Sequence, residues 1–169
     1  MELYNKFDPI GNFLSNWRNS VVRKQVKGRL IDIACGDNRL VRSHPGNGLG
    51  IDIQKFENVD LVVDDFSQIP LPNESYDTAT IVASLNYFSN AREVLEEIRR
   101  ILTDQCRLII TMPNSSLIKY WLKIRDPEAH RLFMPRSQIV EIIETSGFKV
   151  VKEWQFMLSL NRFYLCNKR

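Results

Sequence analysis

The sequence predicts an α/β domain with a mostly parallel sheet, an antiparallel last strand and helices on both faces. Short apolar runs alternate with segments of helical periodicity, and a glycine-containing turn directly follows the first apolar run. The chain has 169 residues, which suits one domain. Its 44% hydrophobic and 25% charged residues exclude a disordered or low-complexity chain.

The first helix is predicted to begin at Pro9, with Asp8 as its N-cap, and to end before Gly28. Residues 1–28 would form an N-terminal cap on a single domain that spans residues 1–169. Four apolar side chains at helical spacing are expected to face the core, namely Phe13, Leu14, Trp17 and Val21.

Strands are expected at residues 30–33, 49–53, 59–63, 79–83, 107–112, 148–156 and 160–165. Pro45 and Gly46 end a short helix after the first strand. Only residues 54–58 separate the second and third strands, which predicts a shortened helix in that connection. Asn90 and Glu93 form a capping-box pattern before a helix. That helix would carry an apolar stripe of Val94, Leu95, Ile98, Ile101 and Leu102. Another helix is expected over 138–145, before Gly147.

Acidic residues follow several predicted strands at the carboxyl edge, where open parallel sheets bind ligands. Asp52 ends the second strand and lies 20 residues after Asp32, an offset typical of acids that hold a ribose. Asp65 could accept a hydrogen bond from an adenine amine, with Phe66 or Ile53 packing on the ring.

These segments resemble the class I S-adenosylmethionine-dependent methyltransferases, which have a Rossmann-like fold. Residues 31–36 resemble the first, glycine-rich motif of that family, and Ile51-Asp52 resembles the second. Residues 65–77, 97–102 and 145–151 match later segments in the same order. Ala34 and Asn38 depart from the family's usual glycines; asparagine tolerates left-handed backbone.

The resemblance implies S-adenosyl-L-methionine as cofactor and methyl transfer by in-line displacement. The cofactor contacts it implies are Asp32, Ala34, Cys35, Gly36, Asn38, Asp52, Ile53, Asp65, Phe66, Ser84 and Leu85. A dinucleotide oxidoreductase is disfavoured, because its phosphate turn needs glycines where this chain has Ala34 and Arg39.

Residues 114–136 are expected to form an insertion that covers the acceptor. His130 is the candidate general base, and the candidate acceptor contacts are Asn86, Tyr87, Tyr120 and Trp121. Ordinary surface exposure of His130, and strand-end packing of Asn86 and Tyr87, are the alternatives. Residues 115–125 fit a basic amphipathic helix, which could pack on the sheet rim, cover an apolar or anionic acceptor, or rest on a membrane.

The expected function is methyl transfer to a small-molecule or lipid-like acceptor. The alternatives are a cofactor-binding but catalytically silent interaction module and an RNA or protein methyltransferase. Basic residues between Arg18 and Arg29 motivate the RNA alternative, but a solvated helix face explains them better, so nucleic acid is not the expected partner. No nearby acids oppose this stretch, whereas residues 30–113 are acidic overall.

The composition also indicates the environment. Three scattered cysteines suit neither a disulfide framework nor a metal site. No apolar run approaches the length of a membrane span, and the N-terminus has no apolar signal core. We therefore expect a cytoplasmic protein without a bound metal.

Overall fold

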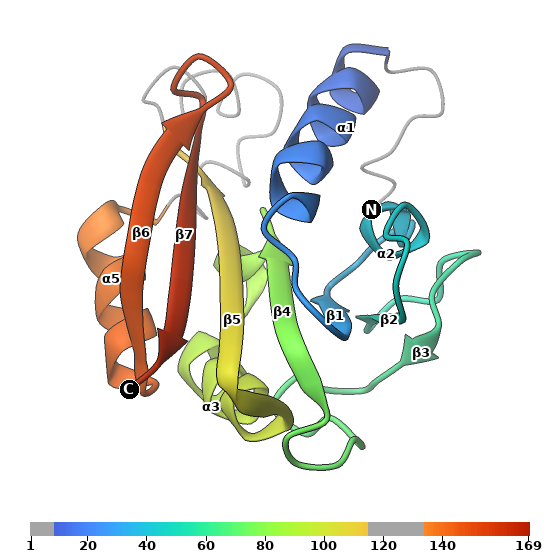
Figure 1. Ribbon diagram of the computed structural model, residues 1–169. Helices are drawn as coiled ribbons and strands as arrows, with labels where there is room; N and C mark the ends of the chain where they lie inside the picture. The colour runs from blue at the N-terminus through green and yellow to red at the C-terminus, as the bar shows by residue number, and fades with distance from the viewer. Residues whose placement is uncertain (1–8, 115–133) are drawn as a thin grey trace.

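A computed structural model describes residues 9–114 and 134–169 and shows a seven-stranded sheet in the order β3-β2-β1-β4-β5-β7-β6 (Figure 1). Neighbouring strands from β3 to β5 are parallel, and β7 runs antiparallel to both β5 and β6. The predicted mostly parallel sheet with an antiparallel last strand is confirmed. The strands are β1 Leu30–Ile33, β2 Gly48–Asp52, β3 Leu61–Val62, β4 Tyr76–Val82, β5 Leu102–Pro113, β6 Phe148–Phe156 and β7 Asn161–Lys168.

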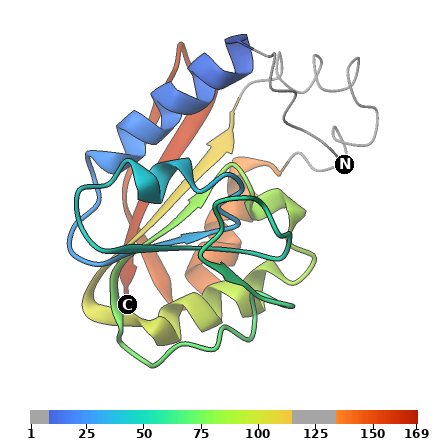
Figure 2. The ribbon, with the colours of Figure 1, turned by 90° about the vertical axis from the view of Figure 1, so that its right-hand side faces the viewer.

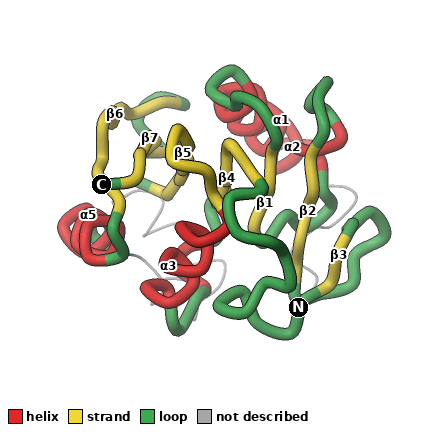
Figure 3. The backbone as a smooth tube through the Cα atoms, turned by 60° about the horizontal axis from the view of Figure 1, so that its bottom comes forward, coloured by secondary structure: helices red, strands yellow, loops and turns green. Residues whose placement is uncertain are grey.

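Helices cover both faces of the sheet, as predicted. Helices α1 and α2 lie on one face and α3 and α5 on the other (Figure 3). The helices are α1 Pro9–Arg23, α2 Arg39–Arg42, α3 Ala91–Ile101 and α5 Arg136–Thr145, and a 3₁₀ turn, η1, spans Leu85–Tyr87. Helix α2 has only four residues.

The main apolar core lies between the sheet and helices α3 and α5. Alternate strand residues such as Ile31, Ile81 and Ile110 pack there against the buried stripe of α3, which includes Leu95 and Ile98. The period of two on the strands and the period near 3.6 on the helix bring these apolar side chains to one interface. The stripe predicted for α3 is therefore confirmed for Val94, Leu95, Ile98 and Ile101, whereas Leu102 begins β5.

The capping box predicted for α3 does not form. Asn90 occupies the N-cap position, but its side chain makes no hydrogen bond to the helix backbone. It forms a hydrogen bond with Asp65 instead. The start of α3 is therefore tied to the segment after β3.

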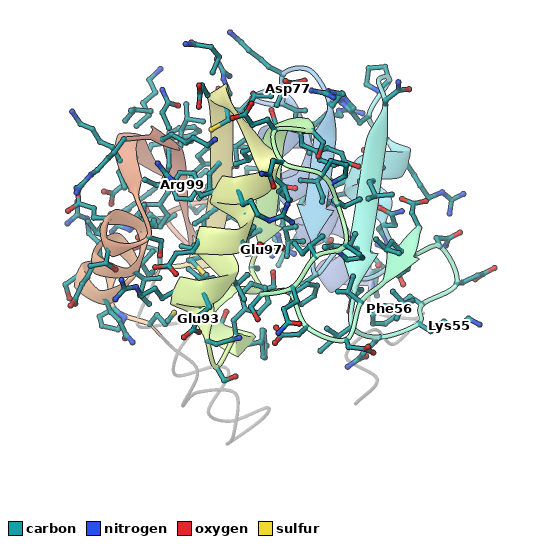
Figure 4. All side chains as sticks on the ribbon, turned by 90° about the horizontal axis from the view of Figure 1, so that it is seen from below. Lys55, Phe56, Asp77, Glu93, Glu97 and Arg99 are labelled. Atoms are coloured by element: carbon teal, nitrogen blue, oxygen red, sulfur yellow. The ribbon has the colours of Figure 1, made fainter. Side chains whose placement is uncertain are left out.

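Glu97 and Arg100 fix the loop that leads from Asp65 to β4. Glu97 Oε1 accepts a hydrogen bond from the Ile69 backbone N–H at 2.8 Å, and Arg100 Nη2 donates to the Ile69 carbonyl at 3.0 Å. Arg100 also pairs with Glu97 at 2.7 Å. Figure 4 shows Glu97 on α3 beside this loop, and Arg99 further along the helix. The resemblance over residues 97–102 thus falls on a helix that holds the loop.

The connection between β2 and β3 contains turns and no helix, so the predicted shortening is complete. Asn38 Nδ2 donates to the Asn58 carbonyl at 2.8 Å and to Asp60 Oδ2 at 2.7 Å. Asp60 Oδ2 also accepts from the Gly50 N–H at 2.8 Å. A Cβ at Gly50 would lie 2.0 Å from Asn38 Oδ1, so only glycine fits there. These hydrogen bonds hold the link, with Lys55 and Phe56 at its outer side (Figure 4).

The apolar stripe predicted for α1 is wrong in its orientation. Phe13 is 63% exposed and Trp17 is 39% exposed, whereas Ser15 and Val22 are buried. Helix α1 therefore turns a mixed polar and apolar face to the sheet. The sheet surface under it carries a smaller apolar cluster, which includes Val22 of α1, Ile109 and Phe163, beside the polar side chains described below. Phe13 and Trp17 lie outside this cluster.

The limits of two strands, β5 and β3, differ from the predicted ones. Strand β5 begins at Leu102, directly after α3, where the strand was expected to begin at residue 107. Strand β3 has two residues where five were expected. His44, in the turn after α2, is half-buried. Among the described residues, no helix is long and apolar enough to cross a membrane.

Candidate functional site

The turn after β1 has an unusual backbone at the carboxyl edge of the sheet. Ala34, Gly36 and Asn38 have φ angles of 57°, 55° and 56°, so every second residue is left-handed although only one is glycine. This conformation costs a side-chain-bearing residue roughly 1–2 kcal/mol. A Cβ placed on Gly36 would meet nothing within 4 Å, so open space lies over the turn.

Asp52 joins this turn to the end of β2. Its side chain is buried, and Oδ2 accepts a hydrogen bond from the Gly36 N–H at 2.9 Å while Oδ1 accepts from the Gln54 N–H at 2.9 Å. A carboxylate has about four acceptor positions, so each oxygen keeps capacity for one further donor. The acid predicted to hold a ribose therefore lies directly beside the open turn.

Asp32 is a buried acid on β1, and burial raises the pKa of its carboxyl to about 7. The hydrogen bond from Thr80 Oγ1, at 2.5 Å, and the charge of Arg18 lower that pKa, and the charge of Asp52 raises it. Arg18 belongs to α1, so α1 brings a cation to the acid of β1. This electrostatic arrangement suits a zwitterionic ligand group.

Cys35 lies in the same turn. Burial raises the pKa of its thiol, and the charges of Asp32 and Asp52 raise it further. The thiol therefore stays protonated and is a poor nucleophile. Its backbone N–H donates to the Ile51 carbonyl at 3.1 Å, which pins the turn to β2.

Asn38 is not a pocket-lining side chain, contrary to the prediction. It is 1% exposed and its amide nitrogen is bound in the β2–β3 link. Its left-handed backbone shapes the turn, as expected for a substitute for glycine.

The two side chains proposed to pack on an adenine ring have different environments. Phe66 is buried in the core, with its ring centroid 5.2 Å from that of Phe88, and its contact with a ligand stays a prediction. Ile53 is 52% exposed at the end of β2 and is available. Asp65 Oδ1 accepts from the Ser67 N–H at 2.8 Å, and this bond lowers the pKa of the Asp65 carboxyl, which stays ionised.

The segment after β4 presents polar atoms that lack protein partners. Ser84 Oγ, Asn86 Oδ1 and Thr111 Oγ1 are buried without a hydrogen bond among the described residues. Leu85 is fully buried, so its side chain belongs to the core, and Tyr87 is 50% exposed. Buried polar groups are normally satisfied, so this region suits a polar ligand or bound water.

Arg18, Thr80 and Thr111 were missed by sequence reasoning. The available signal was the alternation in β1, β4 and β5, where Asp32, Thr80 and Thr111 interrupt otherwise apolar runs on one face. Such polar residues in buried strands are rare without a partner or a ligand. Arg18 could be recognised only from the packing of α1.

Other cations of the basic stretch also have partners within the chain. Arg23 Nη1 donates to the Ser43 carbonyl at 2.9 Å, and Arg29 pairs with Asp77 at 3.3 Å. The solvated-face interpretation holds in part, because Lys24 and Lys27 are exposed.

The candidate base His130 and the candidate contacts Tyr120 and Trp121 lie outside the described residues, as do most of residues 114–136. Within residues 9–114 and 134–169, no group of three or more His, Cys, Asp or Glu side chains could hold a metal ion.

Comparison of the sequence with known proteins gives two relatives that are aligned over most of their length. Demethylmenaquinone methyltransferase of Thermotoga maritima is 25% identical over 192 residues, covering 86% of this chain and 84% of that protein. The enzyme of the same name from Chlamydia pneumoniae is 24% identical over 195 residues, covering 90% and 85%.

Solved structures show the same fold. The PH0226 protein of Pyrococcus horikoshii superposes with a TM-score of 0.78 at 14% identity, covering 99% of this chain and 95% of that one. A SAM-dependent methyltransferase of Aquifex aeolicus superposes with a TM-score of 0.71 at 17% identity, covering 90% and 89%.

The family described as "Methyltransferase domain" matches residues 6–153. This match covers the turn after β1, the acids at the carboxyl edge and helices α3 and α5. The chain therefore belongs to the methyltransferase domain family and is a class I S-adenosylmethionine-dependent methyltransferase.

Proposed function

We propose that this enzyme methylates a small, largely apolar acceptor at the carboxyl edge of β1, β2 and β4. The observation that carries the proposal is the open turn at Gly36, bordered by Asp52 and by buried polar atoms without protein partners. The open space and the unused acceptors suit the nucleoside part of S-adenosylmethionine.

The proposed ribose contact is Asp52. Two backbone N–H groups fix its carboxylate, and the remaining lone pairs would accept hydrogen bonds from the two ribose hydroxyls. The backbone of Ala34, Cys35 and Gly36 borders the same space. Ile53 would cover one face of the adenine ring, and Asp65 would accept from its amine.

Asp32 and Arg18 are proposed to hold the amino-acid end. That end carries an ammonium and a carboxylate, and the two side chains carry the opposite charges. Ligand binding would favour the ionised form of Asp32, because an ammonium beside it stabilises the carboxylate. Asp32 would then face the ligand's ammonium in addition to the charge of Arg18.

When bound, the cofactor supplies an electrophilic methyl carbon on a sulfonium sulfur. A nucleophilic electron pair of the acceptor, either a lone pair or a ring π pair, would form the new bond to that carbon while the carbon–sulfur bond breaks. The electrons of the broken bond would go to sulfur, and a protonated acceptor would lose its proton. The enzyme must align the acceptor and exclude water. Ser84, Asn86 and Tyr87 lie after β4 in a position to do so. If the acceptor is a phenol or amine, His130 is the proposed base for its proton.

The acceptor is proposed to be aromatic or lipid-like. Its support is the exposure of Tyr87 at the edge and the name of the two relatives, demethylmenaquinone methyltransferase. Residues 114–136 are proposed to cover it, with Tyr120 and Trp121 as contacts. A demethylated quinone is the first compound to test.

Calorimetric titration with S-adenosylmethionine and with its demethylated product tests the cofactor site. Asp52→Asn should weaken binding by about 2–3 kcal/mol, because a buried charged acceptor is lost. Asp64→Asn, at an exposed acid after β3, is the matched control and should leave the affinity unchanged. Equal affinities for both variants would remove Asp52 from the site.

Transfer of a labelled methyl group tests the acceptor. The enzyme is expected to label a demethylated hydroquinone, the reduced and therefore nucleophilic form of a demethylated quinone, which is then extracted into organic solvent. It is not expected to label a transfer RNA or histone. Cofactor binding without labelling of any apolar acceptor would contradict the acceptor class but not the cofactor site.

A further inference from the structure

Helix α1 exposes an aromatic pair to solvent. Phe13 and Trp17 lie one turn apart, with ring centroids 6.0 Å apart, and they are 63% and 39% exposed. Large apolar side chains are seldom exposed as neighbouring pairs without a partner. Figure 2 shows α1 running along the outer boundary of the molecule.

Cations follow the aromatic pair at the C-terminal end of the helix. Arg23 is the last residue of α1, and Lys24 is the first residue after it. Both side chains are exposed. Residues 9–31 contain no acid, so nothing within this segment neutralises them.

A hollow adjoins these cations where the end of α1 meets the turn after α2. It has a volume of about 430 Å³ and is lined by Arg23, Lys24, Val26, Ser43, His44 and Pro45. Its lining contains no acid. Nδ1 of His44 is buried without a hydrogen-bond partner among the described residues. The hollow therefore suits an anionic group that can accept hydrogen bonds, such as a phosphate ester.

Three described acids that lie near this stretch in sequence or in space are engaged elsewhere. Asp32 is bound by Thr80, Asp37 pairs with Arg39 at 3.1 Å, and Asp77 pairs with Arg29. The face therefore carries uncompensated positive charge next to exposed aromatic rings.

We propose that this face of α1, with the hollow at its end, is a docking surface for an anionic lipid bilayer. Phe13 and Trp17 would enter the headgroup region, while Arg23 and Lys24 contact lipid phosphates, one of which occupies the hollow. Amphipathic helices with aromatic and basic residues bind membranes in this way. A convex helix suits a bilayer better than single-stranded RNA, which proteins bind in grooves. The surface is separate from the proposed cofactor contacts.

Co-sedimentation with vesicles tests this proposal. The wild-type enzyme should bind vesicles of phosphatidylglycerol and phosphatidylcholine at low salt and not vesicles of phosphatidylcholine alone. We expect at least a tenfold loss of binding in Phe13→Ser/Trp17→Ser and in Arg23→Gln/Lys24→Gln. High salt should weaken wild-type binding.

Val151→Ser/Lys152→Gln on β6 is the matched control, because it also removes one exposed apolar and one exposed basic side chain. It should bind vesicles like the wild type. Thermal unfolding and cofactor titration of all variants report whether the fold and the cofactor site are intact. Undiminished binding by both α1 variants, or wild-type binding to single-stranded RNA and not to anionic vesicles, would overturn the proposal.

Discussion

The two faces of the central sheet are built differently. On the face covered by α3 and α5, the alternate strand residues are apolar and fully buried, as in Ile31, Ile81 and Ile110. On the face covered by α1 and α2, the neighbouring residues in the same strands include Asp32, Thr80 and Thr111 (Figure 3). The same strands thus present an apolar surface on one side and a partly polar surface on the other.

This difference separates stability from function within one sheet. The apolar face gains free energy from burial, at about 25 cal/mol per Å² of apolar surface. The polar face contains a buried acid with a raised pKa and a buried hydroxyl, Thr111 Oγ1, without a protein partner, and both cost free energy in the ligand-free state. A domain can retain such a face because the opposite face supplies enough burial.

Shortening a side chain in the apolar core should have the largest effect on stability. Ile98→Ala removes buried methyl groups from the α3 stripe and should lower the free energy of unfolding by about 2–5 kcal/mol in urea denaturation. Cofactor affinity of the folded fraction should not change, because Ile98 lies on the face away from Asp32. A loss of cofactor affinity that accompanies the loss of stability would show that the two faces of the sheet do not act independently.

Removing the buried charge on the polar face should have the opposite effect on stability. A folded-state pKa near 7 lies above the unfolded value, so the contribution of Asp32 is fully favourable below about pH 4 and is lost as pH rises through 7. A shift of about three units corresponds to roughly 4 kcal/mol at pH 8. Asp32→Asn should therefore stabilise the ligand-free enzyme. The expected gain is only about 1–3 kcal/mol, because Arg18 loses a partner.

Urea denaturation of wild type and Asp32→Asn between pH 4 and 8 checks this prediction. The difference in stability should be largest at pH 8 and should shrink towards pH 4, while cofactor affinity falls in the variant. A variant that is less stable than wild type at pH 8 would show that the Asp32 charge is fully compensated in the folded state.

Much of the apolar face could be predicted from the sequence, because its strands and α3 follow simple periodicities. The stripe through Leu95 and Ile98 and the strand at Leu30–Ile33 were predicted correctly. The α1 stripe was not, because the periodicity rule assumes an apolar seat and the sheet under α1 is partly polar. The rule therefore assigned Phe13 and Trp17 to the core.

For the site, the sequence predicted which residues reach the carboxyl edge better than where their side chains point. Asp32, Asp52 and Gly36 lie at the open turn as expected. Asn38 and Phe66 lie in adjacent loop segments but turn into the protein, because loops have no regular period from which side-chain direction follows. Asn38 holds the β2–β3 link, which contains no helix, through hydrogen bonds to Asn58 and Asp60. These two residues lie far from Asn38 in the sequence.

Two substitutions in the β1 turn should give the smallest effects and sharpen the distinction between backbone and side-chain roles. Ala34→Gly should raise the free energy of unfolding by about 0.5–1 kcal/mol, because glycine adopts a φ of 57° without the steric cost of a Cβ. Asn38→Gly relieves the same backbone cost at a φ of 56° but removes both hydrogen bonds to the β2–β3 link, so a net loss of about 1 kcal/mol is expected. Chemical denaturation of both variants measures the two changes. If both stabilise the enzyme, the β2–β3 link does not depend on Asn38, and its hydrogen bonds add little to the turn.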